Sequence, residues 1–237
     1  MGRTEAMKVT LEEQLSYSLR RQQVDAFLAQ QLAQLPSGSR LLDLGGVKHG
    51  QRGHSRTASQ GLQVTVANLV TDKGLDLLTD AAHLPLATAS YPAVLCSEVL
   101  EHVSDPLAVV QQIQRVLQPG GLLLATVPFM FRQHADPSDY GRYTEWFWSE
   151  NLQRLGFTQI VIEKQGLFGS VLADMLRHWW QQRLLEGSRP RRLNRWLLPR
   201  LMAAARRRAL RFDQQHAQHR VWSSYTSGFG IRAHKPA

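Results

Sequence analysis

Cysteine is nearly absent from this sequence, which has one, Cys96, among 237 residues. A single cysteine can form neither an internal disulfide nor a multi-cysteine zinc site, and this usage is typical of a reducing compartment. The chain also has no run of 18 uncharged apolar residues, so we expect no transmembrane helix. Its first residues lack the apolar core of a secretory signal. These absences favour a cytoplasmic protein.

Lysine is absent from one long segment, residues 177–220, although this segment is the most basic part of the chain. It holds twelve arginines against two acids, Glu186 and Asp213, and therefore carries +10, whereas the whole chain carries +9. The remaining residues sum to −1. The charge therefore indicates a nearly neutral body with one basic segment that suits an anionic partner.

Hydrophobic patterning predicts alternating strands and helices. Apolar residues at helical spacings predict helices over 8–35, 106–117 and 144–156. Short apolar or alternating runs predict strands over 40–46, 63–70, 75–80, 91–99, 122–131, 157–165 and 224–235. This order favours an α/β fold with a doubly wound, mostly parallel sheet and helices on both faces.

The predicted strands end in residues that suit a ligand site. Asp43, Gly45 and Gly46 follow the first strand, Asn68 ends the second, Asp80 ends the third, and Ser97 and Glu98 end the fourth. Ligands of such sheets bind at the carboxyl ends of the strands, so we expect these residues to gather at one edge. A dinucleotide site fits poorly, because Gly45, Gly46 and Gly50 do not supply the spacing Gly-x-Gly-x-x-Gly.

Four motifs occur in order along the chain: DLGG, TDAAHLPL, SEVLEHVSDP and RVLQPGGLLLATVP. Together they resemble the successive motifs of class I S-adenosylmethionine-dependent methyltransferases, most closely the type 11 group. The resemblance covers roughly residues 20–165, and SGFGIRAHK resembles the final antiparallel strand of the family. It implies a Rossmann-like seven-stranded sheet in a single domain over 1–237. A helical cap over 1–38 and a basic helical insertion over 167–221 complete the expected organisation.

The same resemblance implies the cofactor site for S-adenosylmethionine. Two departures from the family pattern stand out: the second and third glycines are displaced, and Asn68 replaces the usual Asp or Glu at the ribose. The implied contacts are Asp43, Gly45 and Gly46 under the methionine half, Asn68 at the ribose, Asp80 and Ala81 at the adenine, and Ser97 and Glu98 at the methionine end.

Residues 134–144, HADPSDYGRYT, follow the fifth predicted strand and resemble a segment found in one bacterial subgroup. For an oxygen or nitrogen acceptor, a base must remove a proton, and we prefer His134 for this role with Tyr140 as a second catalytic candidate. His102 and Asp139 are further candidates, and Arg142 suits an anionic acceptor. Some quinone-pathway relatives use the positions of Glu98, Glu101 and His102 to hold a metal, but we expect no metal here.

Three functional hypotheses follow. The first is a methyltransferase for a small-molecule, glycan or lipid-linked acceptor, and the second is an RNA methyltransferase that uses the basic segment. The third is a non-catalytic relative that has lost useful cofactor affinity. The basic segment, with Trp179, Trp180 and Trp196 and with Leu193 and Leu197, has three interpretations. It covers the acceptor pocket, lies on an anionic membrane at the inner face, or contacts nucleic acid, the last being least favoured.

Overall fold

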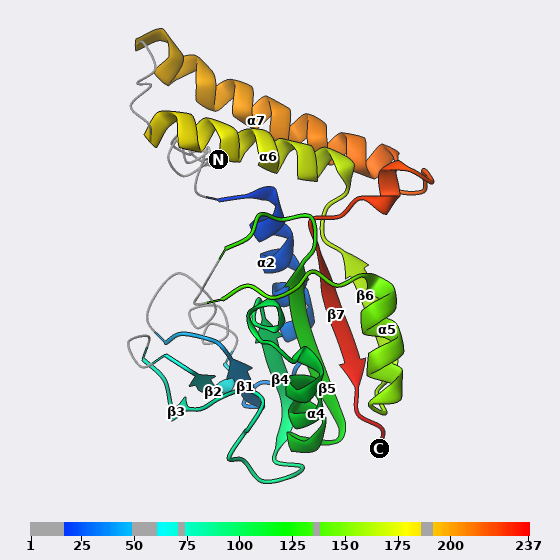
Figure 1. Cartoon of the computed structure of the whole chain (residues 1–237). Coiled ribbons are helices and arrows are strands. Elements are labelled where there is room, and N and C mark those ends of the chain that lie inside the picture. The colour runs from blue at the N-terminus through cyan, green and yellow to red at the C-terminus, as the bar shows by residue number, and fades with distance from the viewer. Residues whose placement is uncertain (1–16, 49–60, 71–73, 135–137, 186–191) are drawn as a thin grey trace, which may run out of the picture. The chain divides into compact units, whose positions relative to one another are not determined.

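The computed structural model describes residues 17–48, 61–70, 74–134, 138–185 and 192–237, and for 184–185 and 192–199 it describes the backbone only (Figure 1). The chain divides into two compact units. Residues 24–165 and 228–237 form one, here called the sheet unit, and residues 1–23 and 166–227 form the other, the helical unit. Helix α2, Leu19–Leu32, passes from the helical unit into the sheet unit. No helix in the described part of the chain is long and apolar enough to cross a bilayer.

The sheet unit is built on a seven-stranded sheet of order β3-β2-β1-β4-β5-β7-β6. Pairing is parallel from β3 to β5, whereas β7 runs antiparallel to both of its neighbours. The strands are β1 Arg40–Leu44, β2 Gln63–Asn68, β3 Leu77–Leu78, β4 Tyr91–Ser97, β5 Leu117–Pro128, β6 Thr158–Lys164 and β7 Gly228–His234. The predicted fold class is therefore confirmed.

Helices cover both faces of this sheet because the central strands are apolar on both sides. On one face, Val24, Phe27 and Leu28 of α2 pack in one buried cluster with Leu41 and Leu95. On the other face, the next residues along the strands, among them Leu42 and Cys96, belong to a second cluster. Helices α4, Pro106–Val116, and α5, Glu145–Arg154, supply its other side. The alternation of inward residues thus follows the two-residue period of a strand.

Both helices of the second face begin at a capping residue. The Asp105 carboxylate accepts hydrogen bonds from the backbone N–H groups of Leu107 and Ala108, each at 3.0 Å, and Pro106 opens α4. The Thr144 hydroxyl accepts from the N–H of Phe147 at 3.3 Å at the start of α5. Such caps satisfy N–H groups that have no partner within the helix, so the loops before both helices enter them at defined points.

The helical unit consists mainly of two helices, α6 Phe168–Leu185 and α7 Arg192–Gln215, which lie side by side in Figure 1 and are followed by the short 3₁₀ turn η3, Trp222–Ser224. Asp213 of α7 is buried and accepts from the N–H groups of Leu167, Gly169 and Ser170 at 2.7–3.1 Å. The hydroxyl of Ser170 also donates to Asp213 at 2.6 Å. One carboxylate of α7 therefore caps the start of α6.

Several predicted boundaries need correction. The helix predicted over 8–35 is α2, which begins at Leu19, and residues 8–16 lie outside the described part of the chain. The strand predicted from 224 begins only at Gly228, because η3 occupies 222–224. The fifth strand begins at Leu117 rather than 122, since its pairing with β4 shifts register over the Pro-Gly-Gly run instead of stopping there.

Candidate functional site

The carboxyl ends of β1, β2, β4 and β5 lie at one edge of the sheet unit, because these strands are parallel neighbours. The turn after β1, Asn68 at the end of β2, Ser97 at the end of β4 and the loop after β5 therefore share this edge. The sequence predicted this grouping from the order of the motifs.

Asp43 and Gly46 form the tightest feature of this edge. Asp43 is buried, and its Oδ2 has no hydrogen-bond partner among the described residues. Burial raises the pKa of this carboxyl to about 7. A Cβ on Gly46 would collide with the Asp43 carboxylate, so only glycine fits there. The next-door Gly45 has φ +75°, which favours glycine, and a side chain on it would strike Val99.

Asn68 lies against this turn. Its amide nitrogen donates to the carbonyl of Gly46 at 2.8 Å, and its amide oxygen accepts from the N–H of Val70 at 3.2 Å. The amide thus joins the ends of β1 and β2. Its predicted contact with a ribose stays a prediction, and in this structure the side chain has a positioning task that an Asp could not fully take over, since Asp lacks the donor.

Asp80 follows β3, and its carboxylate is half exposed. It accepts from the N–H of Ala82 at 2.9 Å and lies 3.2 Å from Nδ1 of His83. The hydrogen bond from Ala82 is the main cause that lowers the pKa of Asp80, with His83 adding to it. Asp80 is therefore ionised at neutral pH and has acceptor capacity left for a ligand. Ala81 is partly buried against the core beside it.

The side-chain oxygens of Ser97, Thr126 and Glu98 form a hydrogen-bonded chain at the ends of β4 and β5. Thr126 is fully buried, and its hydroxyl donates to Oε1 of Glu98 at 2.8 Å. Since that proton is committed, the Ser97 hydroxyl is the donor in its 2.8 Å bond to Thr126. Glu98 has φ +59°, a strained backbone for a residue with a Cβ. Thr126 was missed in the sequence, where the only signal is its place in the strand that neighbours Ser97.

His134 is held on the loop after β5 by an ion pair. Arg142 binds both carboxylate oxygens of Asp139, at 2.5 and 2.7 Å, and Asp139 accepts from the N–H of His134 at 2.9 Å. Arg142 holds the pKa of Asp139 well below its usual range. Nδ1 of His134 faces the Arg132 carbonyl at 3.4 Å and the Asp139 carboxylate at 3.5 Å. Two acceptors at Nδ1 favour the tautomer that leaves Nε2 unprotonated.

A second imidazole lies beside the first. The rings of His102 and His134 meet edge to face with centroids 4.9 Å apart. Nδ1 of His102 lies 2.5 Å from the carbonyl of Ser138, and its Nε2 lies 3.7 Å from the buried carboxylate of Glu101. Desolvation and the neighbouring His102 lower the pKa of His134. Tyr140, the other catalytic candidate, is 59% exposed, and its backbone N–H donates to the carbonyl of Glu101.

Glu101, His102 and His134 each offer a ligand atom, and these atoms lie within 4.8 Å of one another. A carboxylate with two imidazoles suits a divalent cation. This set differs from the one considered in the sequence, because Glu98 is bound to Thr126 and His134 takes its place. The cluster can therefore serve either as a metal site or as a general base, His134, together with the two residues that surround it.

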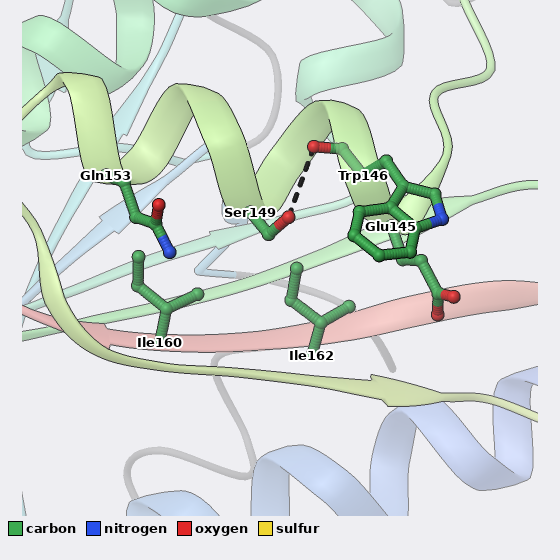
Figure 2. Close-up of a pocket in the computed structure, with 6 residues that line it drawn as sticks. All are labelled: Glu145, Trp146, Ser149, Gln153, Ile160 and Ile162. Atoms are coloured by element: carbon green, nitrogen blue, oxygen red, sulfur yellow. Dashed lines mark hydrogen bonds between the residues drawn. The ribbon is translucent and has the colours of Figure 1, made fainter.

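An open pocket of about 250 Å³ lies elsewhere in the sheet unit, between α5 and β6 (Figure 2). Its lining residues are Glu145, Trp146, Ser149, Gln153, Ile160 and Ile162. None of the residues predicted for the cofactor or for catalysis is among them. The pocket therefore contributes nothing to the site at the strand ends.

The strand-end residues fit a bound S-adenosylmethionine. Asp43 presents a buried oxygen that has no partner among the described residues, and the lack of a side chain at Gly46 lets the backbone of the turn lie directly against this carboxylate. A buried acceptor without a partner and a turn without side chains suit a ligand that has polar groups and approaches the backbone closely. The fold is that of the class I S-adenosylmethionine-dependent methyltransferases, with β7 antiparallel to its neighbours and a glycine turn after β1.

Comparison with known proteins gives partial matches. Residues 55–125 match the family model described as methyltransferase domain. Ubiquinone biosynthesis O-methyltransferase of Xanthomonas oryzae is 51% identical over 41 residues. That match spans 17% of this chain and only 17% of the relative. Residues 55–125 thus match a methyltransferase domain, and the resemblance to the curated relative is confined to a short stretch.

Two solved structures share the fold. Phosphoethanolamine N-methyltransferase 2 of Haemonchus contortus, solved with S-adenosyl-L-methionine, has a TM-score of 0.57 at 18% identity over 98% of this chain and 59% of that one. A putative sarcosine dimethylglycine methyltransferase of Galdieria sulphuraria has a TM-score of 0.59 at 16% identity over 91% and 86%. At these identities the similarity establishes the fold alone.

Proposed function

We propose that the protein transfers a methyl group from S-adenosylmethionine to an oxygen or nitrogen of a small-molecule, glycan or lipid-linked acceptor. The observation that carries the proposal is the position of His134 on the loop after β5, at the same edge as the Asp43–Gly46 turn. The name of the matching relatives, ubiquinone biosynthesis O-methyltransferase, supports an oxygen acceptor.

The residues of the site divide into two groups with separate tasks. Asp43, Gly46 and Asp80 would hold the cofactor, which when bound supplies an electrophilic methyl group. His134 would accept the proton of the acceptor at Nε2, while its Nδ1–H donates to the Arg132 carbonyl. The ion pair of Asp139 and Arg142 fixes the loop that carries it.

The test is methyl transfer from labelled cofactor to a fractionated cell extract. We expect label in the lipid or small-molecule fraction, and His134→Ala should lower the rate about 10²–10⁴-fold because the base is lost. Since the pKa of His134 lies below its ordinary 6.5, the imidazole stays neutral and active into mildly acidic pH. Activity should fall only when the pH drops below the lowered pKa of His134 and the ring becomes protonated.

The adjacent, exposed Gln133 provides the matched control, because Gln133→Ala alters the same loop without touching the base. Full activity in His134→Ala would refute the assignment of the base. Label found in RNA would favour the RNA methyltransferase instead. Dialysis against EDTA should leave the rate unchanged, whereas a loss restored by a divalent cation would assign Glu101, His102 and His134 to a metal.

A further inference from the structure

The exposed face of α6 is apolar from Leu172 to Trp180, over about two and a half turns. Its exposed residues recur at spacings of three and four, which places them in one stripe along the helix. The opposite face is buried and includes Ser170, Val171 and Asp174. The stripe, here called the α6 stripe, consists of Leu172 (45% exposed), Met175 (53%), Leu176 (51%), Trp179 (51%) and Trp180 (37%). Exposed apolar surface of this continuity marks an interaction site.

Arginine lies at the end of this stripe and on the neighbouring helix. Arg183 continues it by one turn, and its guanidinium lies 5.6 Å from the centre of the Trp179 ring. On α7 the exposed side chains include Arg200, Arg207, Arg208 and Arg211. Of the two acids within 177–220, Asp213 is buried and caps the start of α6, so it does not offset the exposed arginines. The solvent therefore meets apolar side chains and positive charge on the same pair of helices.

The combination of exposed apolar side chains and arginines favours one of three kinds of partner: a second copy of the chain, RNA or an anionic bilayer. A second copy of the chain would bring another segment of +10 to the same surface, and the like charges would repel. RNA would use the arginines and the two tryptophans, but Leu172, Met175 and Leu176 offer nothing to phosphates or to stacked bases. An anionic bilayer can bind both the apolar stripe and the arginines, because apolar side chains enter the acyl boundary while arginines contact the headgroups.

We propose that the helical unit binds the surface of an anionic membrane, with the α6 stripe inserted at the interface and the arginines of α6 and α7 on the lipid headgroups. The sequence suggested a membrane contact through Trp179, Trp180 and Trp196, with Leu193 and Leu197. The side chains of the last three lie outside the described part of the chain. The structure adds Leu172, Met175 and Leu176 to the two tryptophans of α6. The proposal does not depend on methyl transfer, since every residue in it belongs to the helical unit.

The experiment is cosedimentation of the full chain with vesicles of phosphatidylcholine containing 30% phosphatidylglycerol, and with phosphatidylcholine alone. We expect binding to the anionic vesicles at low salt, a blue shift of tryptophan fluorescence, and partial loss of binding as salt screens the arginines. The double variant Leu176→Gln with Trp179→Ser should bind at least tenfold more weakly. Arg207→Gln with Arg208→Gln should weaken binding to anionic vesicles only.

Trp146→Ser is the matched control, because Trp146 is 70% exposed on α5 in the sheet unit. It should bind vesicles like the parent, and circular dichroism should show all variants folded. No binding to anionic vesicles would overturn the proposal. So would unchanged binding of the Leu176→Gln, Trp179→Ser variant, which would reduce the contact to charge alone. A dimer abolished by that variant, without vesicle binding, would also overturn it and assign the stripe to a second copy.

Discussion

At the scale of single residues, Asp43 has the most unusual surroundings at the strand ends. This carboxyl is buried among β1, β2 and β4 and loses its hydration, and within the described part of the chain Oδ2 gains no hydrogen bond in exchange. Burial therefore favours its neutral form and raises its pKa to about 7. Cys96 of β4 has its pKa raised by the same burial and by the nearby carboxylates Glu101 and Asp43. In the absence of cofactor, ionisation of Asp43 should therefore lower the stability of the fold.

The sign of its effect on stability follows from the direction of the shift. In the unfolded chain Asp43 ionises near its ordinary pKa of 3.8, whereas in the folded chain it holds its proton until about pH 7. The free energy of unfolding therefore falls as pH rises through this window, by up to about 4 kcal/mol at ~1.4 kcal/mol per pH unit. Asp43→Asn should remove this dependence between pH 5 and pH 8.

The measurement is urea unfolding of parent and variant, without cofactor, at several pH values. Asp80→Asn is the control, because the lowered pKa of Asp80 places its titration below this range. An equal pH dependence in the parent and in Asp43→Asn would show that Asp43 does not titrate as its burial implies.

At the scale of elements, two helix starts depend on carboxylates that are remote in sequence. Asp174 of α6 accepts from the N–H groups of Leu19 and Arg20 at 2.9 and 2.8 Å, at the start of α2. Asp213 of α7 does the same for the start of α6, more than forty residues away. No acidic residue occurs in the first turn of either helix. At α2 this contact adds to a local cap, since the Ser18 hydroxyl accepts from the N–H of Arg21 at 2.9 Å. The start of α6 obtains through a tertiary contact the cap that α4 and α5 obtain from adjacent residues.

Removing the second of these caps should loosen the helical unit. Asp213→Ala deletes the acceptor for three backbone N–H groups and for the Ser170 hydroxyl, and we expect a loss of about 1–3 kcal/mol in the free energy of unfolding. Denaturant unfolding followed by circular dichroism measures this. Asp213→Asn keeps one oxygen acceptor and should lose less. An unchanged unfolding midpoint in Asp213→Ala would show that these bonds add no net stability.

The difference between local contacts and contacts remote in sequence explains how much of the fold and of the site the sequence could predict. Strand ends and motif order are local patterns, so the sheet, the Asp43–Gly46 turn and the place of His134 followed from them. Contacts between residues that are distant in the chain could not be foreseen. Asn68 binds Gly46, 22 positions away, and Thr126 joins Ser97 and Glu98 across two strands. The apolar stripe of α6 is visible in the sequence only once Asp174 and Val171 are known to face inward.

At the scale of the whole molecule, chemistry and charge belong to different units. All the residues predicted for the cofactor and for catalysis are in the sheet unit, whereas the segment of +10 is in the helical unit. The first set supports methyl transfer, and the second supports a surface contact. The two proposals can therefore fail separately, because a variant of the α6 stripe should leave cofactor binding unchanged.

The central claim is that the strand-end edge of the sheet unit binds S-adenosylmethionine, and calorimetric titration of the full chain with this cofactor tests it most directly. We expect saturable binding at one site. In Asp80→Ala, which removes an ionised acceptor at this edge, the dissociation constant should rise about 5–100-fold, equivalent to ~1–3 kcal/mol. Gln133→Ala should bind like the parent. An absence of binding heat in the parent, or equal affinity in Asp80→Ala, would contradict the account.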